Sequence, residues 1–138
     1  MPRTTLTEYC VKVAGPRRAY GDYISFLWGD NWDCDTDGDA KSTTDHYWTE
    51  LTIINRSNVS ERVDVDPSAT DPLTLTVRSE FSYLAARLAY ALAVTTGGTL
   101  SASPDGPAIP AEALISQMGD FDVAVALKRL YEGGHHSA

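Results

Sequence analysis

Apolar and polar residues alternate over much of the first half of the chain, a pattern that predicts β-strands. The alternation is clearest around Val11 and again from Leu73 to Val77. The aromatic and β-branched stretch 23–28 predicts another strand, with Ile24, Phe26 and Trp28 on one face. A further strand is expected over 47–54, with Tyr47, Leu51 and Ile53 sharing a face, and a short one over 62–65.

The spacing of apolar residues becomes helical after residue 79. Ser79 is a candidate N-cap, and apolar residues then recur at Phe81, Leu84, Leu88 and Leu92 until Gly97-Gly98 ends the helix. Alanines between these positions predict that this is the most buried helix. A short strand over 99–101 follows. Pro110 is placed to begin a second helical stretch, which Gly119-Asp120 interrupts and Gly133-Gly134 ends.

Strands that precede helices are typical of the α+β class rather than of alternating α/β folds. We therefore expect a mainly antiparallel sheet of four to six strands in the N-terminal half, with two C-terminal helices packed on one face. A chain of 138 residues matches one domain, spanning 1–138. Within it, the pattern predicts an acidic loop over 29–46 and a disordered tail over 133–138.

The net charge of −8 narrows the classes of partner. Nucleic-acid binding needs cations that displace phosphate counterions, and the sequence contains no run of more than two basic residues. The same charge disfavours anionic membrane surfaces. The first residues lack the apolar run of a signal peptide, and the most apolar stretch, 84–94, is too short to span a bilayer. We expect a cytoplasmic protein with free thiols at Cys10 and Cys34.

Most of the charge lies in the acidic loop. Six aspartates and one lysine between Asp30 and Asp45 give a net charge of −5 over sixteen residues. Residues 33–38 read D-x-D-x-D-G and match the opening of a calcium-binding loop, in which alternate carboxylates surround a hard cation. Asp33, Asp35 and Asp37 would supply side chains and Asp39 a backbone carbonyl.

The calcium motif is incomplete beyond these six residues. Lys41 occupies a position where a neutral or acidic residue serves better, and the twelfth position is Thr44 instead of glutamate. The flanking segments are predicted as strands, not as the two helices of an EF-hand. Ca²⁺ therefore stays open as a cofactor. The other interpretation of the loop is a solvated turn, in which aspartates are common.

The acidic loop also fits a surface that binds a basic protein partner. In this hypothesis Trp32 anchors the contact, and the carboxylates that engage the partner are Asp33, Asp35, Asp37, Asp39 and Asp45. The leading functional prediction is thus a small, acidic, non-enzymatic binding domain. A bacterial immunity protein that neutralises a toxin by covering its basic active site is one concrete form, by analogy of size and charge.

One histidine allows an enzymatic interpretation of the same region. His46, beside Asp45, could act as a base in a small hydrolase together with an aspartate. Cys34 is a poor nucleophile, because neighbouring carboxylates raise the pKa of a thiol. The sequence contains no phosphate-binding, zinc-protease or redox motif that would support an enzyme. The hydrolase is therefore the second alternative, after the calcium-binding domain.

Overall fold

The computed structural model describes residues 6–30, 32–70 and 72–133. The strands are β1 (Thr7–Lys12), β2 (Cys34–Gly38), β3 (Leu51–Asn55), β4 (Arg62–Thr70), β5 (Leu73–Ser79), β6 (Thr99–Ser101) and β7 (Ala108–Ile109). The helices are α1 (Tyr20–Leu27), α2 (Ser82–Thr96) and α3 (Val123–Gly133), with a 3₁₀ helix over Ala111–Gln117. The α+β class is confirmed.

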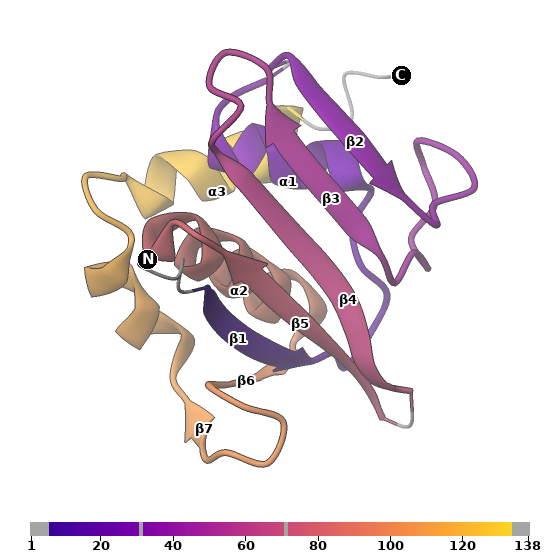
Figure 1. Ribbon diagram of the computed structural model, residues 1–138, viewed down its shortest axis with the longest axis vertical. Coiled ribbons are helices and arrows are strands. Elements are labelled where there is room, and N and C mark those ends of the chain that lie inside the picture. Colours follow the sequence, from indigo (N-terminus) through magenta and orange to yellow (C-terminus); the bar gives the residue numbers. More distant parts are fainter. Residues whose placement is uncertain (1–5, 31, 71, 134–138) are drawn as a thin grey trace, which may run out of the picture.

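The seven strands form one antiparallel sheet in the order β2-β3-β4-β5-β1-β6-β7. All three α-helices lie on the same face of this sheet, behind it in Figure 1. The apolar side chains of β1, β3, β4 and β5 point toward the helices and form the core with α2. The opposite face carries polar and charged residues, and we call it the open face.

The central helix behaves as predicted. Leu84, Leu88 and Leu92 are fully buried, and so are most of the alanines between them. Gly97 ends the helix in the left-handed conformation, with φ of 67°. Ser79 is not its N-cap, because it is the last residue of β5; its hydroxyl instead accepts a hydrogen bond from the backbone N–H of Phe81.

The prediction of a strand over 23–28 is wrong, because most of this segment belongs to the helix α1. Tyr23, Phe26 and Leu27 recur at helical spacing, and all three are buried. The guanidinium of Arg129 on α3 donates to the carbonyls of Ser25 and Phe26, near the end of α1 where carbonyls lack helical partners. Tertiary packing therefore overrides the local β-propensity of this aromatic stretch.

Other boundaries also differ from the predictions. The sheet has seven strands instead of four to six, and β6 and β7 lie in the C-terminal half. The predicted acidic loop 29–46 contains the strand β2. Of the predicted tail, Gly133 closes α3 and the remaining residues lie outside the described ranges. None of the described helices is long and apolar enough to cross a membrane.

Candidate functional site

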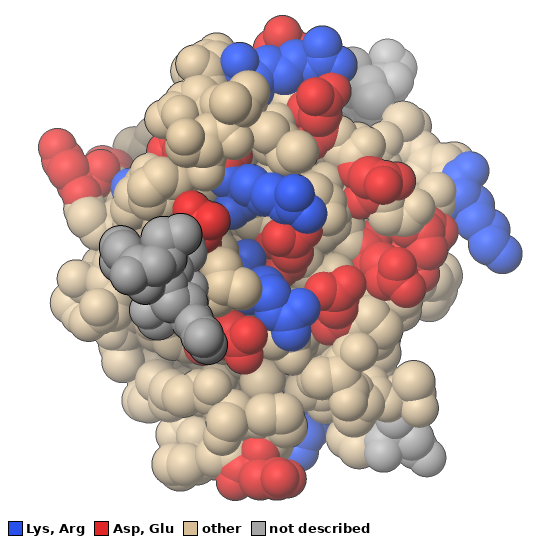
Figure 2. Space-filling view, viewed as in Figure 1, with Lys and Arg blue, Asp and Glu red and all other residues tan. Residues whose placement is uncertain are grey.

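The acidic segment forms one edge of the sheet. Among the described residues, β2 is the terminal strand in the order and pairs only with β3, and the segment after it leads back to the start of β3. We call residues 32–50 the acidic edge. Figure 2 shows acidic side chains gathered on the right of the view, where β2 and its neighbouring segment lie in Figure 1, whereas basic and acidic side chains alternate over the middle strands.

Three carboxylates stand at alternate positions along the start of this edge. Asp33, Asp35 and Asp37 are exposed. Asp35 and Asp37 share the open face, because side chains two residues apart in a strand point the same way. Arg56, just beyond β3, lies 2.5 Å from an oxygen of Asp35 and 3.4 Å from one of Asp33. Since these groups remain more than half exposed, the pairs lower the local charge without burying it.

Asp39 and Asp45 have a different role, because their oxygens bind the backbone of the edge itself. Asp39 accepts hydrogen bonds from the N–H groups of Thr49 and Glu50 and from the Thr49 hydroxyl, at 2.8, 3.0 and 2.7 Å. Asp45 accepts from the N–H groups of Lys41 and Tyr47, which hold its pKa below the ordinary value. These bonds fix the path of the segment between β2 and β3.

A buried arginine ties the same segment to the rest of the protein. The Arg17 backbone N–H donates to the carbonyl of His46, and the Arg17 Nε donates to the carbonyl of Trp48 at 2.9 Å. The Trp48 indole N–H donates in turn to the carbonyl of Arg18 at 3.0 Å. Trp48 is 1% exposed and packs edge-on against Tyr23. These hydrogen bonds therefore fix the backbone of the acidic edge against the rest of the protein.

Trp32 lies just before β2 and is 40% exposed. Its indole N–H donates to the side-chain oxygen of buried Asn55 at 2.9 Å, and Asn55 donates to Glu61 at 2.8 Å. Glu61 also accepts hydrogen bonds from Trp28 and Tyr83. The ring of Trp32 is thus oriented by a network that reaches α1 and α2, while much of its surface faces solvent.

Tyr47 is a second exposed aromatic residue of the acidic edge, in a place that the alternating pattern did not predict. The predicted strand over 47–54 begins only at Leu51, and Tyr47 is 72% exposed instead of sharing a buried face with Leu51 and Ile53. The neighbouring Trp48 turns inward in its place. No local pattern distinguishes these two aromatic residues, because their orientation follows from the contacts of Trp48 with Arg17 and Arg18.

The predicted calcium ligands do not surround a common point. Asp33 and Asp35 contact Arg56, Asp37 accepts from the N–H of Gly38, and Asp39 binds the residues before β3. Within the part of the chain that the structure describes, no three His, Cys, Asp or Glu side chains are placed to hold a metal ion. A strand also spreads alternate carboxylates about 6.6 Å apart, whereas a calcium loop curls them inward. Calcium binding stays a prediction that this geometry does not favour.

The predicted hydrolase pair is not assembled either. His46 is exposed, and its Nδ1 lies 2.8 Å from the backbone carbonyl of Arg17. Because Asp45 binds backbone N–H groups, it does not orient the imidazole. Both cysteines are free thiols. Burial, together with Asp33 and Asp35, raises the pKa of Cys34 to about 11, which makes its thiol a weak nucleophile near neutral pH.

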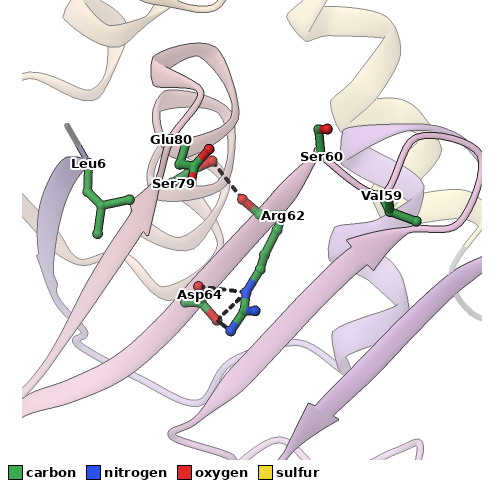
Figure 3. A pocket seen from close by; sticks show the side chains of 7 residues that line it. All are labelled: Leu6, Val59, Ser60, Arg62, Asp64, Ser79 and Glu80. Atoms are coloured by element: carbon green, nitrogen blue, oxygen red, sulfur yellow. Dashed lines mark hydrogen bonds and ion pairs between the residues drawn. The ribbon is translucent and has the colours of Figure 1, made fainter. Parts of the chain in front are cut away.

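A separate hollow of about 340 Å³ lies on the open face, away from the acidic edge. Figure 3 shows the exposed aliphatic residues Leu6 and Val59 on its two sides, with Arg62 and Asp64 between them. The Arg62 guanidinium donates to both oxygens of Asp64, so its charge is already balanced. This hollow therefore offers no concentrated charge to a ligand.

Comparison of the chain with protein-family models, with curated proteins and with solved structures returned no match.

Proposed function

We propose that this protein is a small, non-enzymatic binding domain whose acidic edge engages a basic surface of another protein. One observation carries the proposal: exposed carboxylates are arrayed along a sheet edge whose backbone is held in place by hydrogen bonds and buried side chains. A surface that is already ordered loses little conformational entropy on binding. The array is therefore suited to recognition.

Electrostatic steering supports a basic partner. Between Asp30 and Asp45 the net charge is −5, and Arg56 offsets only one unit of it. Complementary charge accelerates association and rejects partners of the same sign, while adding less to affinity. Asp35 and Asp37 on β2 are the residues that we expect to act in this way, because they lie side by side on the open face.

The two exposed aromatic residues supply the apolar part of such a contact. Trp32 precedes β2 and Tyr47 lies in the segment after it. Tryptophan and tyrosine are enriched among residues that dominate interface energies. Because Trp32 is already oriented by Asn55, it needs little ordering when a partner covers it. We infer that Trp32 anchors the complex and that the carboxylates guide its approach.

A toxin-neutralising immunity protein is the concrete form that we propose. A nuclease that acts on anionic nucleic acid presents basic residues, and a rigid acidic edge could cover them. This form rests on charge complementarity alone. Calcium binding and hydrolysis, the other predictions from the sequence, gain no specific support from the positions of Asp33–Asp39 and His46 described above.

Affinity capture with paired variants tests the proposal. The double variant Asp35→Asn/Asp37→Asn removes two charges from the acidic edge, whereas Asp105→Asn/Glu112→Gln removes two exposed charges elsewhere. We expect the wild type and the second variant to retain a basic protein that the first variant loses. The rate of association with that protein should fall as ionic strength rises.

Two results would overturn the proposal. One is equal retention of the partner by both double variants. The other is an association rate that does not respond to ionic strength, because steering by exposed charges is screened by salt. Trp32→Ala, compared with Trp32→Phe, should speed dissociation more than it slows association, since an anchor acts after the encounter.

A further inference from the structure

The backbone of β2 is oriented so that alternate residues present their polar groups to solvent. The Arg56 N–H donates to the carbonyl of Asp33 at 3.1 Å, and the Asp39 N–H donates to the carbonyl of Glu50 at 3.3 Å. In an antiparallel ladder such hydrogen-bonded pairs recur at every second residue. Residues 33, 35, 37 and 39 therefore turn their backbone toward β3, and Cys34 and Thr36 turn theirs away from the sheet.

The two sides of this edge differ in chemistry. On the open face, Asp35 and Asp37 stand two residues apart. On the helix side, a hollow of about 200 Å³ borders the strand, lined by Tyr20, Thr36, Asp37, Gly38, Ala40 and Leu51. A cavity of about 150 Å³ holds a benzene ring, so this space accommodates one side chain. An added strand would thus meet carboxylates on one face and a receptive hollow on the other.

A second copy of the chain is a poor occupant of this edge. Pairing β2 with β2 would place Asp35 and Asp37 against the same residues of the other copy, and like charges on facing strands are destabilising. Charged residues are a common means by which proteins prevent edges from pairing with each other. The same carboxylates favour an extended segment with basic residues at alternate positions.

We propose that a basic segment of the partner binds by adding an antiparallel strand to the outer edge of β2. This inference rests on the proposed function and specifies how recognition occurs. The added strand hydrogen-bonds to the outward N–H and C=O groups of Cys34 and Thr36. Lysine or arginine side chains directly opposite Asp35 and Asp37 lie beside these carboxylates, and the residue opposite Thr36 places its side chain at the hollow.

The geometry determines in which direction the backbone N–H of each residue in the added strand points. Residues opposite Asp35 and Asp37 turn their N–H groups away from β2, because the aspartates' own backbone groups face β3. The residue opposite Thr36 turns its N–H toward β2. The basic residues are thus recognised by their side chains and the intervening residues by their backbone. N-methylation can separate these two contributions.

The experiment uses the wild-type protein and a capped nine-residue peptide of alternating threonine and lysine, with threonine first. One derivative is N-methylated at the central threonines and another at the central lysines. We expect N-methylation at threonine to weaken binding at least tenfold, because it removes donors that face β2. Methylation at lysine should change the affinity less than twofold. Amide hydrogen exchange at Cys34 and Thr36 should slow at least tenfold in the complex.

Equal binding of the two methylated peptides, or unchanged exchange at Thr36, would overturn strand addition and leave attraction between charges. Failure of the unmodified peptide to bind at low salt would also overturn it, since the carboxylates would then only guard the edge. These failures differ from failure of the proposed function, which is measured by capture of a basic protein with the paired charge variants and does not depend on a strand.

Discussion

Asp39 is the residue whose replacement should loosen the acidic edge most directly. Its carboxylate receives three hydrogen bonds, two from Thr49 and one from Glu50. The variant Asp39→Ala removes all three and leaves the backbone bond between Asp39 and Glu50 in place. We therefore expect the segment between β2 and β3 to lose its fixed path while the sheet persists.

The size of the effect follows from the exposure of the site. A hydrogen bond to a charged group contributes about 1.5–3 kcal/mol, but Asp39 is exposed and water replaces part of what is lost. Replacing an aspartate that caps a helix with alanine, a comparable case, costs about 0.5–2 kcal/mol. We expect Asp39→Ala to lower the free energy of unfolding by about 1–2 kcal/mol. For a chain of 138 residues this lowers the melting midpoint by about 3–7 °C.

The pH dependence gives an independent readout. Burial alone would raise the pKa of Asp39, but hydrogen bonds from Glu50 and Thr49 outweigh it and hold the pKa below its ordinary value of 3.8. A folded-state pKa below the unfolded value stabilises the protein at higher pH, and this contribution is lost as the pH falls through the folded pKa. The difference in stability between the wild type and Asp39→Asn should therefore shrink below about pH 4.

Thermal and urea unfolding measure both effects, and Asp37→Ala is the matched control. Asp37 is exposed, and its carboxylate accepts a hydrogen bond from the N–H of the adjacent Gly38. Its replacement should change stability by no more than about 0.5 kcal/mol. Equal midpoints for Asp37→Ala and Asp39→Ala would refute the assignment of Asp39 as the residue that holds the edge.

Trp48→Ala should lower the free energy of unfolding in urea by about 3–5 kcal/mol, because the side chain is 1% exposed; a loss below about 1 kcal/mol would contradict its place in the core. Burial and the hydrogen bond to Glu61 raise the pKa of Tyr83 to about 12, so the variant Glu61→Gln should lower this pKa. A tyrosine absorbance titration measures it, with Tyr83→Phe as the blank, and an unchanged titration would assign the shift to burial alone. Burial and nearby aspartates raise the pKa of the Cys34 thiol to about 11, so alkylation by iodoacetamide at pH 8 should be slow in the folded protein and faster in Asp35→Asn. Equal rates in the two proteins would show that Asp35 does not contribute to the raised pKa. The melting midpoint should be the same in calcium as in magnesium; a calcium-specific rise of several degrees would instead support an ion site in the acidic edge.

The aspartates have two different roles, exposed charge and binding of the backbone, and the position of each along the segment decides which role it has. Asp35 and Asp37 fall inside β2, where the pleat turns them to the open face. Asp39 and Asp45 follow the strand, where free backbone N–H groups attract their carboxylates. Partner-binding variants should therefore be made in the strand, and stability variants in the segment after it.

Much of the fold is determined by periodicity within the sequence. The strands around Val11 and from Leu73 follow from local alternation, and the helix that carries Leu84, Leu88 and Leu92 follows from helical spacing. These elements bury one consistent set of side chains, and local propensity agrees with their packing. The sequence also determines the concentration of negative charge between residues 30 and 45, because the number of aspartates there does not depend on the fold.

Tertiary structure alone decided the form of the acidic edge. The aromatic stretch at Tyr23 and Phe26 becomes a helix because α2 and α3 cover it, and the contact with Trp48 is made over more than twenty residues of sequence. Arg56 reaches Asp35 only because the register pairs β2 with β3. Local sequence carries no information about such distant partners. The physical reason is that strand pairing and side-chain burial are settled by the whole core, whereas propensity acts over a few residues.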